Sequence, residues 1–139
     1  MIEDSLSLRH IFAVAAFGAV GVVARLALGR AAARWPFGEF PYGTLAINVV
    51  GSFLIGLLHV GGAERNLLSP EWRMALSVGL LGGFTTFSTF SLEAVRLLEG
   101  GMYASAAAYF LGSPLLGVAA AGCGIFVGRL FLFGNTGAP

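Results

Sequence analysis

Four long apolar stretches, separated by short polar segments, dominate the pattern of hydrophobic and polar positions along the chain. Each stretch is long enough for an α-helix to cross the hydrocarbon core of a bilayer, which takes about 20 residues. We therefore predict an all-α membrane protein, with residues 1–139 forming one domain of four transmembrane helices. The expected spans are residues 11–33, 41–62, 74–98 and 101–130.

Two of the expected helices carry polar side chains at a spacing of four, which places those side chains on one helical face. They are Thr44, Asn48 and Ser52 on the second span, and Ser105, Tyr109 and Ser113 on the fourth. An asparagine in a membrane helix either joins helices by hydrogen bonds or contacts something that passes through the protein. The spacing alone leaves both possibilities open.

The third span contains the segment least suited to a lipid-facing helix, Gly82-Gly83-Phe84-Thr85-Thr86-Phe87-Ser88-Thr89-Phe90. Two adjacent glycines disfavour continuation of a helix. The phenylalanines recur every third residue and are expected near one helical face. Irregular backbone is tolerated at membrane depth only where protein or a water-filled cavity surrounds it. We therefore predict that the third helix is broken between Gly82 and Thr86 and that the functional centre lies there.

The composition agrees with a multi-pass protein of the cell membrane and argues against several functions. Charged residues make up 11% of the chain, against about one quarter in soluble proteins. The net charge of +1 reflects eight basic and seven acidic residues, and the basic residues are all arginines. No basic tract indicates a nucleic-acid partner. Enzymatic activity is not expected either, because no intramembrane carboxylate pair, metal cluster or nucleophile–base set is apparent.

The arginines favour neither orientation in the membrane. With four spans, one side carries Arg9, Arg65, Arg73 and Arg129, and the other carries Arg30, Arg34 and Arg96, with Arg25 near the end of the first span. Arginine bias normally sets orientation, so this balance predicts insertion both ways up and an antiparallel, dual-topology homodimer. A second copy would also cover the polar stripes. Two interpretations of Arg25 stay open, since it either extends to the headgroups or faces a pore.

The motif and the polar stripes together favour the passage of a small anion. The edge of an aromatic ring is the positive part of its quadrupole, so paired rings can contact an anion without the full charge that would hold it too tightly. The Asn48 amide and the hydroxyls of Tyr109 and Ser113 are further donors. Carbonyl oxygens freed by a helix break suit a hard cation such as Na⁺, which on a dimer axis would be structural.

Two other classes of protein have the same number of spans. A small multidrug exporter needs a membrane-embedded carboxylate for proton exchange, whereas the acidic residues here are expected at the span ends and in loops. A non-transporting assembly subunit, held together by glycine-rich faces, would conduct no ions. The polar stripes do not exclude this second alternative.

Residues 82–91, Gly82-Gly83-Phe84-Thr85-Thr86-Phe87-Ser88-Thr89-Phe90-Ser91, resemble the signature of the Fluc (CrcB-type) fluoride channels. Further matching pieces are Gly43-Thr44-Leu45 with Asn48, Gly51-Ser52-Phe53, Arg25, and Tyr109 with Ser113. The resemblance covers essentially the whole chain. It implies an antiparallel, dual-topology homodimer with two pores that passively export fluoride from the cytoplasm and so lower its toxicity.

The resemblance also implies roles for individual residues. Phe87 and Phe90 would be the pore phenylalanines, and Asn48 would bind the ion and orient the rings. The side chains implied to line the polar track are Thr44, Tyr109 and Ser113.

The same resemblance implies a central Na⁺ that is not transported. The backbone carbonyls of Gly82 and Thr85 from both subunits would hold it. Arg25 would belong to the helix packing around a vestibule.

Overall fold

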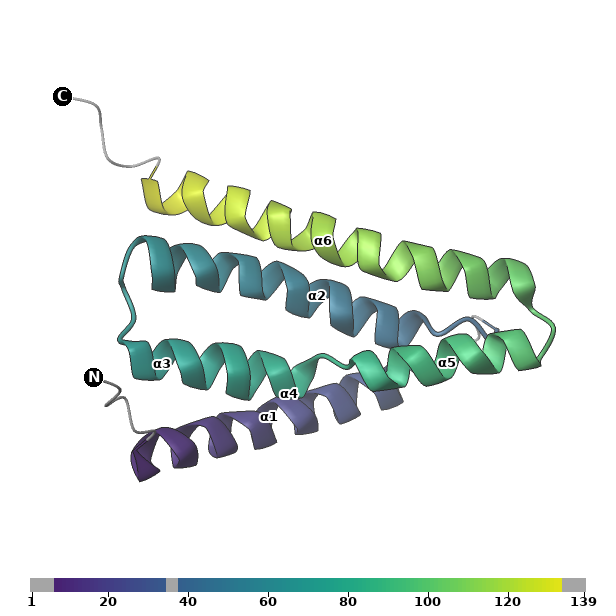
Figure 1. The fold of residues 1–139 in the computed structure, drawn as a ribbon, viewed down its shortest axis with the longest axis horizontal. Coiled ribbons are helices and arrows are strands. Elements are labelled where there is room, and N and C mark those ends of the chain that lie inside the picture. Colours follow the sequence, from purple (N-terminus) through teal and green to yellow (C-terminus); the bar gives the residue numbers. More distant parts are fainter. Residues whose placement is uncertain (1–6, 35–37, 134–139) are drawn as a thin grey trace, which may run out of the picture.

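The computed structural model describes residues 7–34 and 38–133, which form a helical bundle without β-strands (Figure 1). Four helical stretches in these residues are long and apolar enough to cross a membrane. In chain order the elements are α1 (Leu8–Ala32), α2 (Tyr42–His59), η1 (Val60–Glu64), α3 (Pro70–Met74), η2 (Ala75–Leu81), α4 (Gly82–Phe84), α5 (Phe87–Glu99) and α6 (Tyr103–Phe133). Both η segments are π-helical turns that continue or join α-helices.

The third helical stretch, Pro70–Glu99, comprises α3, η2, α4 and α5. It begins earlier than the expected span, which starts at residue 74. The Ser69 hydroxyl accepts the N–H of Trp72 and caps the first turn. Proline is favoured at the first helical position, because its missing N–H would have no partner there. Capping therefore extends the helix by one turn beyond the apolar stretch.

Close approaches between helix backbones fix the bundle. Gly21 of α1 packs directly on the carbonyl of Leu80, and Gly124 of α6 packs on the carbonyl of Phe53 in α2, so a Cβ at either glycine would collide with backbone. Helices can approach this closely only where one of them has a small residue. The result places α6 against α2, and α1 against the third helical stretch (Figure 1).

Two residues of extended backbone, Thr85 (φ −84°, ψ 161°) and Thr86 (φ −151°, ψ 117°), separate α4 from α5. Gly82 and Gly83 are themselves helical. Gly83 has a packing role, because a Cβ there would lie 2.6 Å from the carbonyl oxygen of Gly18 in α1. The irregular backbone is therefore confined to the last two positions of the 82–86 range that the sequence indicates.

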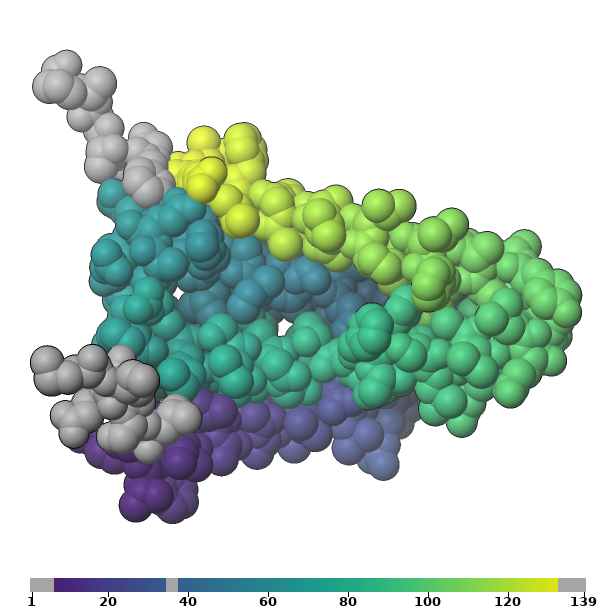
Figure 2. Space-filling view, in the orientation of Figure 1, coloured from purple at the N-terminus to yellow at the C-terminus, as the bar shows by residue number. Residues whose placement is uncertain are grey.

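The bundle is hollowed on one face, where α2 is recessed between α6 and the third helical stretch (Figure 2). The start of α1 and the end of α6 lie at the same end of the bundle, together with the connection from η1 to α3 (Figure 1). The extended residues Thr85 and Thr86 border the hollow.

Candidate ion pathway

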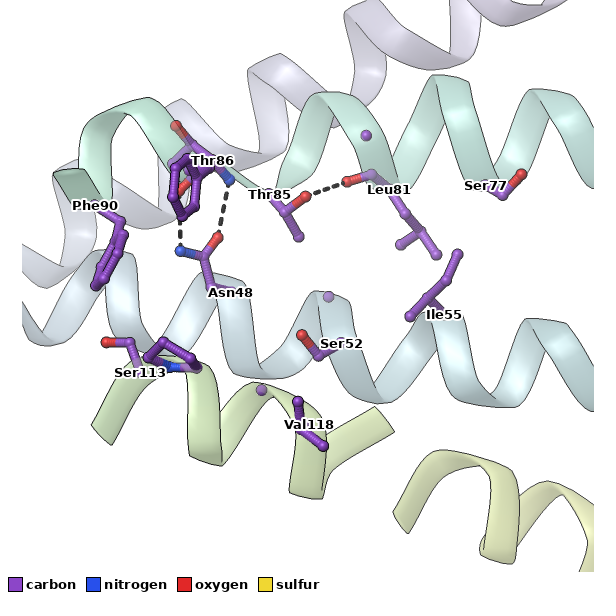
Figure 3. A pocket seen from close by; sticks show the side chains of 15 residues that line it. Asn48, Ser52, Ile55, Ser77, Leu81, Thr85, Thr86, Phe90, Ser113 and Val118 are labelled. Carbon is purple, nitrogen blue, oxygen red and sulfur yellow. Dashed lines mark hydrogen bonds between the residues drawn. The ribbon is translucent and has the colours of Figure 1, made fainter. Parts of the chain in front are cut away.

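A central cavity of about 480 Å³ lies between α2, the third helical stretch and α6 (Figure 3). None of the fifteen residues that line it is charged. Its polar side chains come from three helical stretches and are Asn48, Ser52, Ser77, Thr85, Thr86 and Ser113. Phe87 and Phe90 complete the wall where the extended backbone enters α5. The cavity therefore combines uncharged hydrogen-bonding groups with aromatic rings.

Asn48 binds the extended backbone through both ends of its amide. Its Nδ2 donates to the Thr86 carbonyl at 3.0 Å, and the Thr86 N–H donates to its Oδ1 at 2.9 Å (Figure 3). These two bonds satisfy backbone groups that have left the helical pattern. An asparagine amide has two N–H donors, so one remains for a ligand in the cavity.

The two phenylalanines of the cavity differ in exposure. Phe90 is 5% exposed and packs against Tyr109 with ring centroids 5.0 Å apart, whereas Phe87 is 77% exposed. Their own ring centroids are 5.6 Å apart, with an angle of 42° between the planes. The expectation that Phe84 shares their face is wrong, because Phe84 is buried and lines a different, apolar groove. The extended Thr85 and Thr86 interrupt the helical repeat between them.

A second cavity of about 560 Å³ lies between α1, α2 and α5 and reaches Thr86 from the other side. Arg25 and Thr44 line it. The Arg25 Nε donates to the carbonyl of Gly83 at 3.1 Å. The guanidinium is thus tied to the end of α4 inside the bundle and does not extend freely to the headgroups.

Glu93 is the residue of this region that the sequence analysis missed. Its carboxylate accepts from the Thr44 hydroxyl at 2.8 Å and from the Tyr109 hydroxyl at 2.7 Å. Glu93 is half-buried and lines the second cavity. The expectation of acidic residues at span ends and in loops gave no sign of the two bonds that Glu93 accepts from other helices. The sequence did contain a sign of this position. Glu93 is spaced by three from Phe90 and by four from Leu97, and both of these residues are buried on one face of α5.

The carbonyls of Gly82 and Thr85 lack the partners that a continuous helix would supply. The Thr86 N–H, which would donate to Gly82, donates to Asn48. The Thr89 N–H, which would donate to Thr85, donates to the Thr86 hydroxyl at 3.2 Å. In the residues that the structure describes, these two carbonyl oxygens have thus lost the donors of a regular helix and can accept from another donor or bind a cation.

The structure brings only part of the expected site together around the central cavity. Its lining includes Asn48, Phe87, Phe90, Ser113, Gly82 and Thr85. Thr44 and Arg25 line the second cavity instead. Tyr109 is buried, and its hydroxyl connects to the second cavity through Glu93.

These features define a multi-pass membrane protein whose helix bundle carries, on one face, a cavity lined by uncharged polar and aromatic side chains. The model of the family described as CrcB-like protein, Camphor Resistance (CrcB), matches residues 12–125, and the chain belongs to this family.

Three similar proteins each bear the name Fluoride-specific ion channel FluC. The chain is 48% identical over 123 residues to the protein of Phenylobacterium zucineum, and the aligned residues cover 88% of this chain and 97% of the relative. It is 47% identical over 119 residues to that of Geobacter sulfurreducens (86% and 96% covered). It is 50% identical over 120 residues to that of Nitrobacter winogradskyi (86% and 95% covered). All three names describe ion channels, which are not enzymes.

Proposed function

We propose that the chain forms a fluoride-selective channel of the cell membrane, through which fluoride leaves the cytoplasm passively and its toxicity is lowered. The observation that carries this proposal is the central cavity, where an amide, several hydroxyls and two aromatic rings line one space and none of the described lining residues is charged. The names of the similar proteins support fluoride as the ion.

The chemistry of the cavity suits an anion that must both enter and leave. One Asn48 N–H remains available, and the Ser113 hydroxyl oxygen is buried with no partner within residues 7–34 and 38–133. The adjacent rings of Phe87 and Phe90 add positive ring edges. Neutral donors replace part of the hydration shell, and the lack of a fixed cation keeps binding weak enough for release.

The open side of the cavity supports an antiparallel homodimer. Phe87 is 77% exposed beside polar groups that would lie at membrane depth. Polar groups facing hydrocarbon are costly, and a second copy of the chain would cover them. The near-equal division of arginines between the two sides favours copies inserted in opposite orientations.

The free carbonyls support a structural Na⁺ at the centre of this dimer. Gly82 and Thr85 each present a carbonyl oxygen that has lost its helical donor. Neutral oxygens suit a hard cation, and two-fold symmetry would supply the same pair from each chain. Bound there, Na⁺ would join the two chains and would not be transported.

Glu93 calls for a comparison with the small multidrug exporters, whose mechanism uses an embedded carboxylate. Here both carboxylate oxygens accept hydrogen bonds, from Thr44 and from Tyr109. This network holds the carboxylate in place within the bundle. Together with the channel names of the similar proteins, it favours a positioning role over exchange of protons for drugs.

Fluoride efflux from liposomes tests the proposed channel and the part that the Phe87 and Phe90 rings play in it. Phe87→Ile and Phe90→Ile keep an apolar side chain and remove the ring edge, so fluoride efflux should be lost while the protein still elutes as a dimer. Unchanged efflux from both variants would remove the rings from the mechanism. A parent protein that releases no fluoride would reject the function itself.

A further inference from the structure

Hydroxyl groups on the helices around the central cavity fall into two groups. Serine and threonine in membrane helices commonly donate to a carbonyl one turn earlier in their own helix. Ser77 does so to Arg73 at 2.6 Å, and Thr85 does so to Leu81 at 2.9 Å. Both line the central cavity, yet their hydroxyl protons are already engaged.

Ser52 and Ser113 form the other group. In the part of the chain that the structure describes, neither hydroxyl has a hydrogen-bond partner. The Ser113 oxygen is buried, and both residues line the central cavity. An apolar surrounding makes an unpaired hydroxyl costly. Two unengaged hydroxyls in one cavity therefore indicate a ligand that accepts hydrogen bonds.

Ser52 faces a glycine on the neighbouring helix α6. Ser52 lies one turn beyond Asn48 on α2, and Gly117 lies one turn beyond Ser113 on α6. A Cβ added at Gly117 would lie 3.4 Å from the Ser52 hydroxyl oxygen. Gly117 brings no side chain to this level of the cavity, where the Ser52 hydroxyl lies beside it (Figure 3).

We propose that the Ser52 hydroxyl is a fluoride ligand and forms, with Ser113, a second anion position between the level of Asn48 and the level one helical turn beyond it. This inference rests on the proposed function. The two hydroxyls come from levels of the bundle about one turn, or about 5.4 Å, apart. An anion that accepts two hydrogen bonds of about 2.7 Å bridges such a distance. Ile55 and Val118 line the cavity next to this level and offer the ion no further donor.

Fluoride efflux from liposomes tests the ligand with a matched control. Ser52→Ala should slow fluoride efflux about ten-fold, as expected for loss of one hydrogen bond to an ion. Ser91→Ala removes a hydroxyl that lines neither cavity and donates within its own helix, to the Phe87 carbonyl at 2.9 Å. Its efflux rate should stay close to that of the parent.

A second substitution on the facing helix α6 tests whether Ser52 acts as an ion ligand or only in packing. Gly117→Ser on the Ser52→Ala background returns a hydroxyl to the same level and should restore most of the efflux. Gly117→Ala on that background adds the same bulk without a donor and should restore none. If the Ser52→Ala protein does not assemble, Ser52→Cys takes its place, because cysteine has nearly the shape of serine but is only a weak donor. We expect the same slower efflux and the same restoration by Gly117→Ser.

The outcomes distinguish this inference from the proposed function. No fluoride efflux from the parent chain rejects the channel itself. An active parent with an equally active Ser52→Ala variant overturns the second anion position and leaves the channel intact. Slow efflux that Gly117→Ser does not restore assigns Ser52 to packing and also overturns the proposal.

Discussion

Replacing Asn48 with leucine tests whether one side chain holds the extended backbone between α4 and α5. The amide makes two hydrogen bonds to Thr86, at 3.0 and 2.9 Å, from a residue 38 positions away in the sequence. Leucine has a similar branched shape but neither donates nor accepts. The variant therefore leaves the Thr86 N–H and carbonyl without their partners.

Two estimates bound the energetic cost. Interhelical hydrogen bonds in membranes average about 0.6 kcal/mol each, so the loss of two bonds alone costs about 1.2 kcal/mol. A buried group left unsatisfied costs about 1–3 kcal/mol, or about 2–6 kcal/mol for the two groups of Thr86. We expect the larger range because Thr85 and Thr86 are extended. Their backbone groups cannot return to helical bonds without rebuilding the segment.

Thermal unfolding in detergent and fluoride efflux from liposomes measure the two consequences. Asn48→Leu should lower the melting temperature clearly and abolish efflux. Asn48→Asp keeps an acceptor for the Thr86 N–H, so it should melt closer to the parent. It should still block efflux, because a carboxylate then faces the anion path. If Asn48→Leu melts and conducts like the parent, Asn48 does not organise this region and the reasoning is refuted.

Four further predictions concern the proposed dimer, the proposed Na⁺ site, the role of Glu93 and the packing of the bundle. In a Cys123→Ser background, a cysteine at Leu67 should be labelled from each side of the membrane in about half of the molecules, and labelling from one side only would reject dual topology. Replacing Na⁺ by a much larger cation should stop fluoride efflux, and full activity without Na⁺ would argue against the carbonyl site. Glu93→Gln should slow efflux, because the amide cannot accept on both sides as the carboxylate does; an unchanged rate would confine Glu93 to a passive role. Gly124→Leu should prevent assembly, whereas Gly122→Leu, with nothing within 4 Å of the added Cβ, should be tolerated; equal stability of the two would contradict the packing of α6.

The four helical stretches could be predicted from the sequence because bilayer thickness sets a simple length requirement. Their ends were less predictable, as Ser69 and Pro70 show, since capping competes with hydropathy at helix starts. The unusual backbone at Thr85 and Thr86 lies within the predicted range. Its restriction to these two residues depends on contacts between helices distant in the sequence.

Site residues were harder to place because their partners are remote. The stripe containing Asn48 was visible as a periodicity, but its bonds to the Thr86 backbone were not. Phe84 was wrongly grouped with Phe90, because a uniform helical repeat does not pass through extended backbone. Glu93 fell under the general expectation of acidic residues at span ends and in loops, although its helical spacing from Phe90 places it on the buried face of α5.

Anion efflux from liposomes carrying the purified parent protein tests the central claim most directly. Fluoride and chloride are compared under the same imposed potential, with Na⁺ present. An uncharged cavity of donors and ring edges that selects fluoride predicts rapid fluoride release and no chloride release. Release of both ions would contradict selectivity, and release of neither would contradict the channel and favour an assembly subunit.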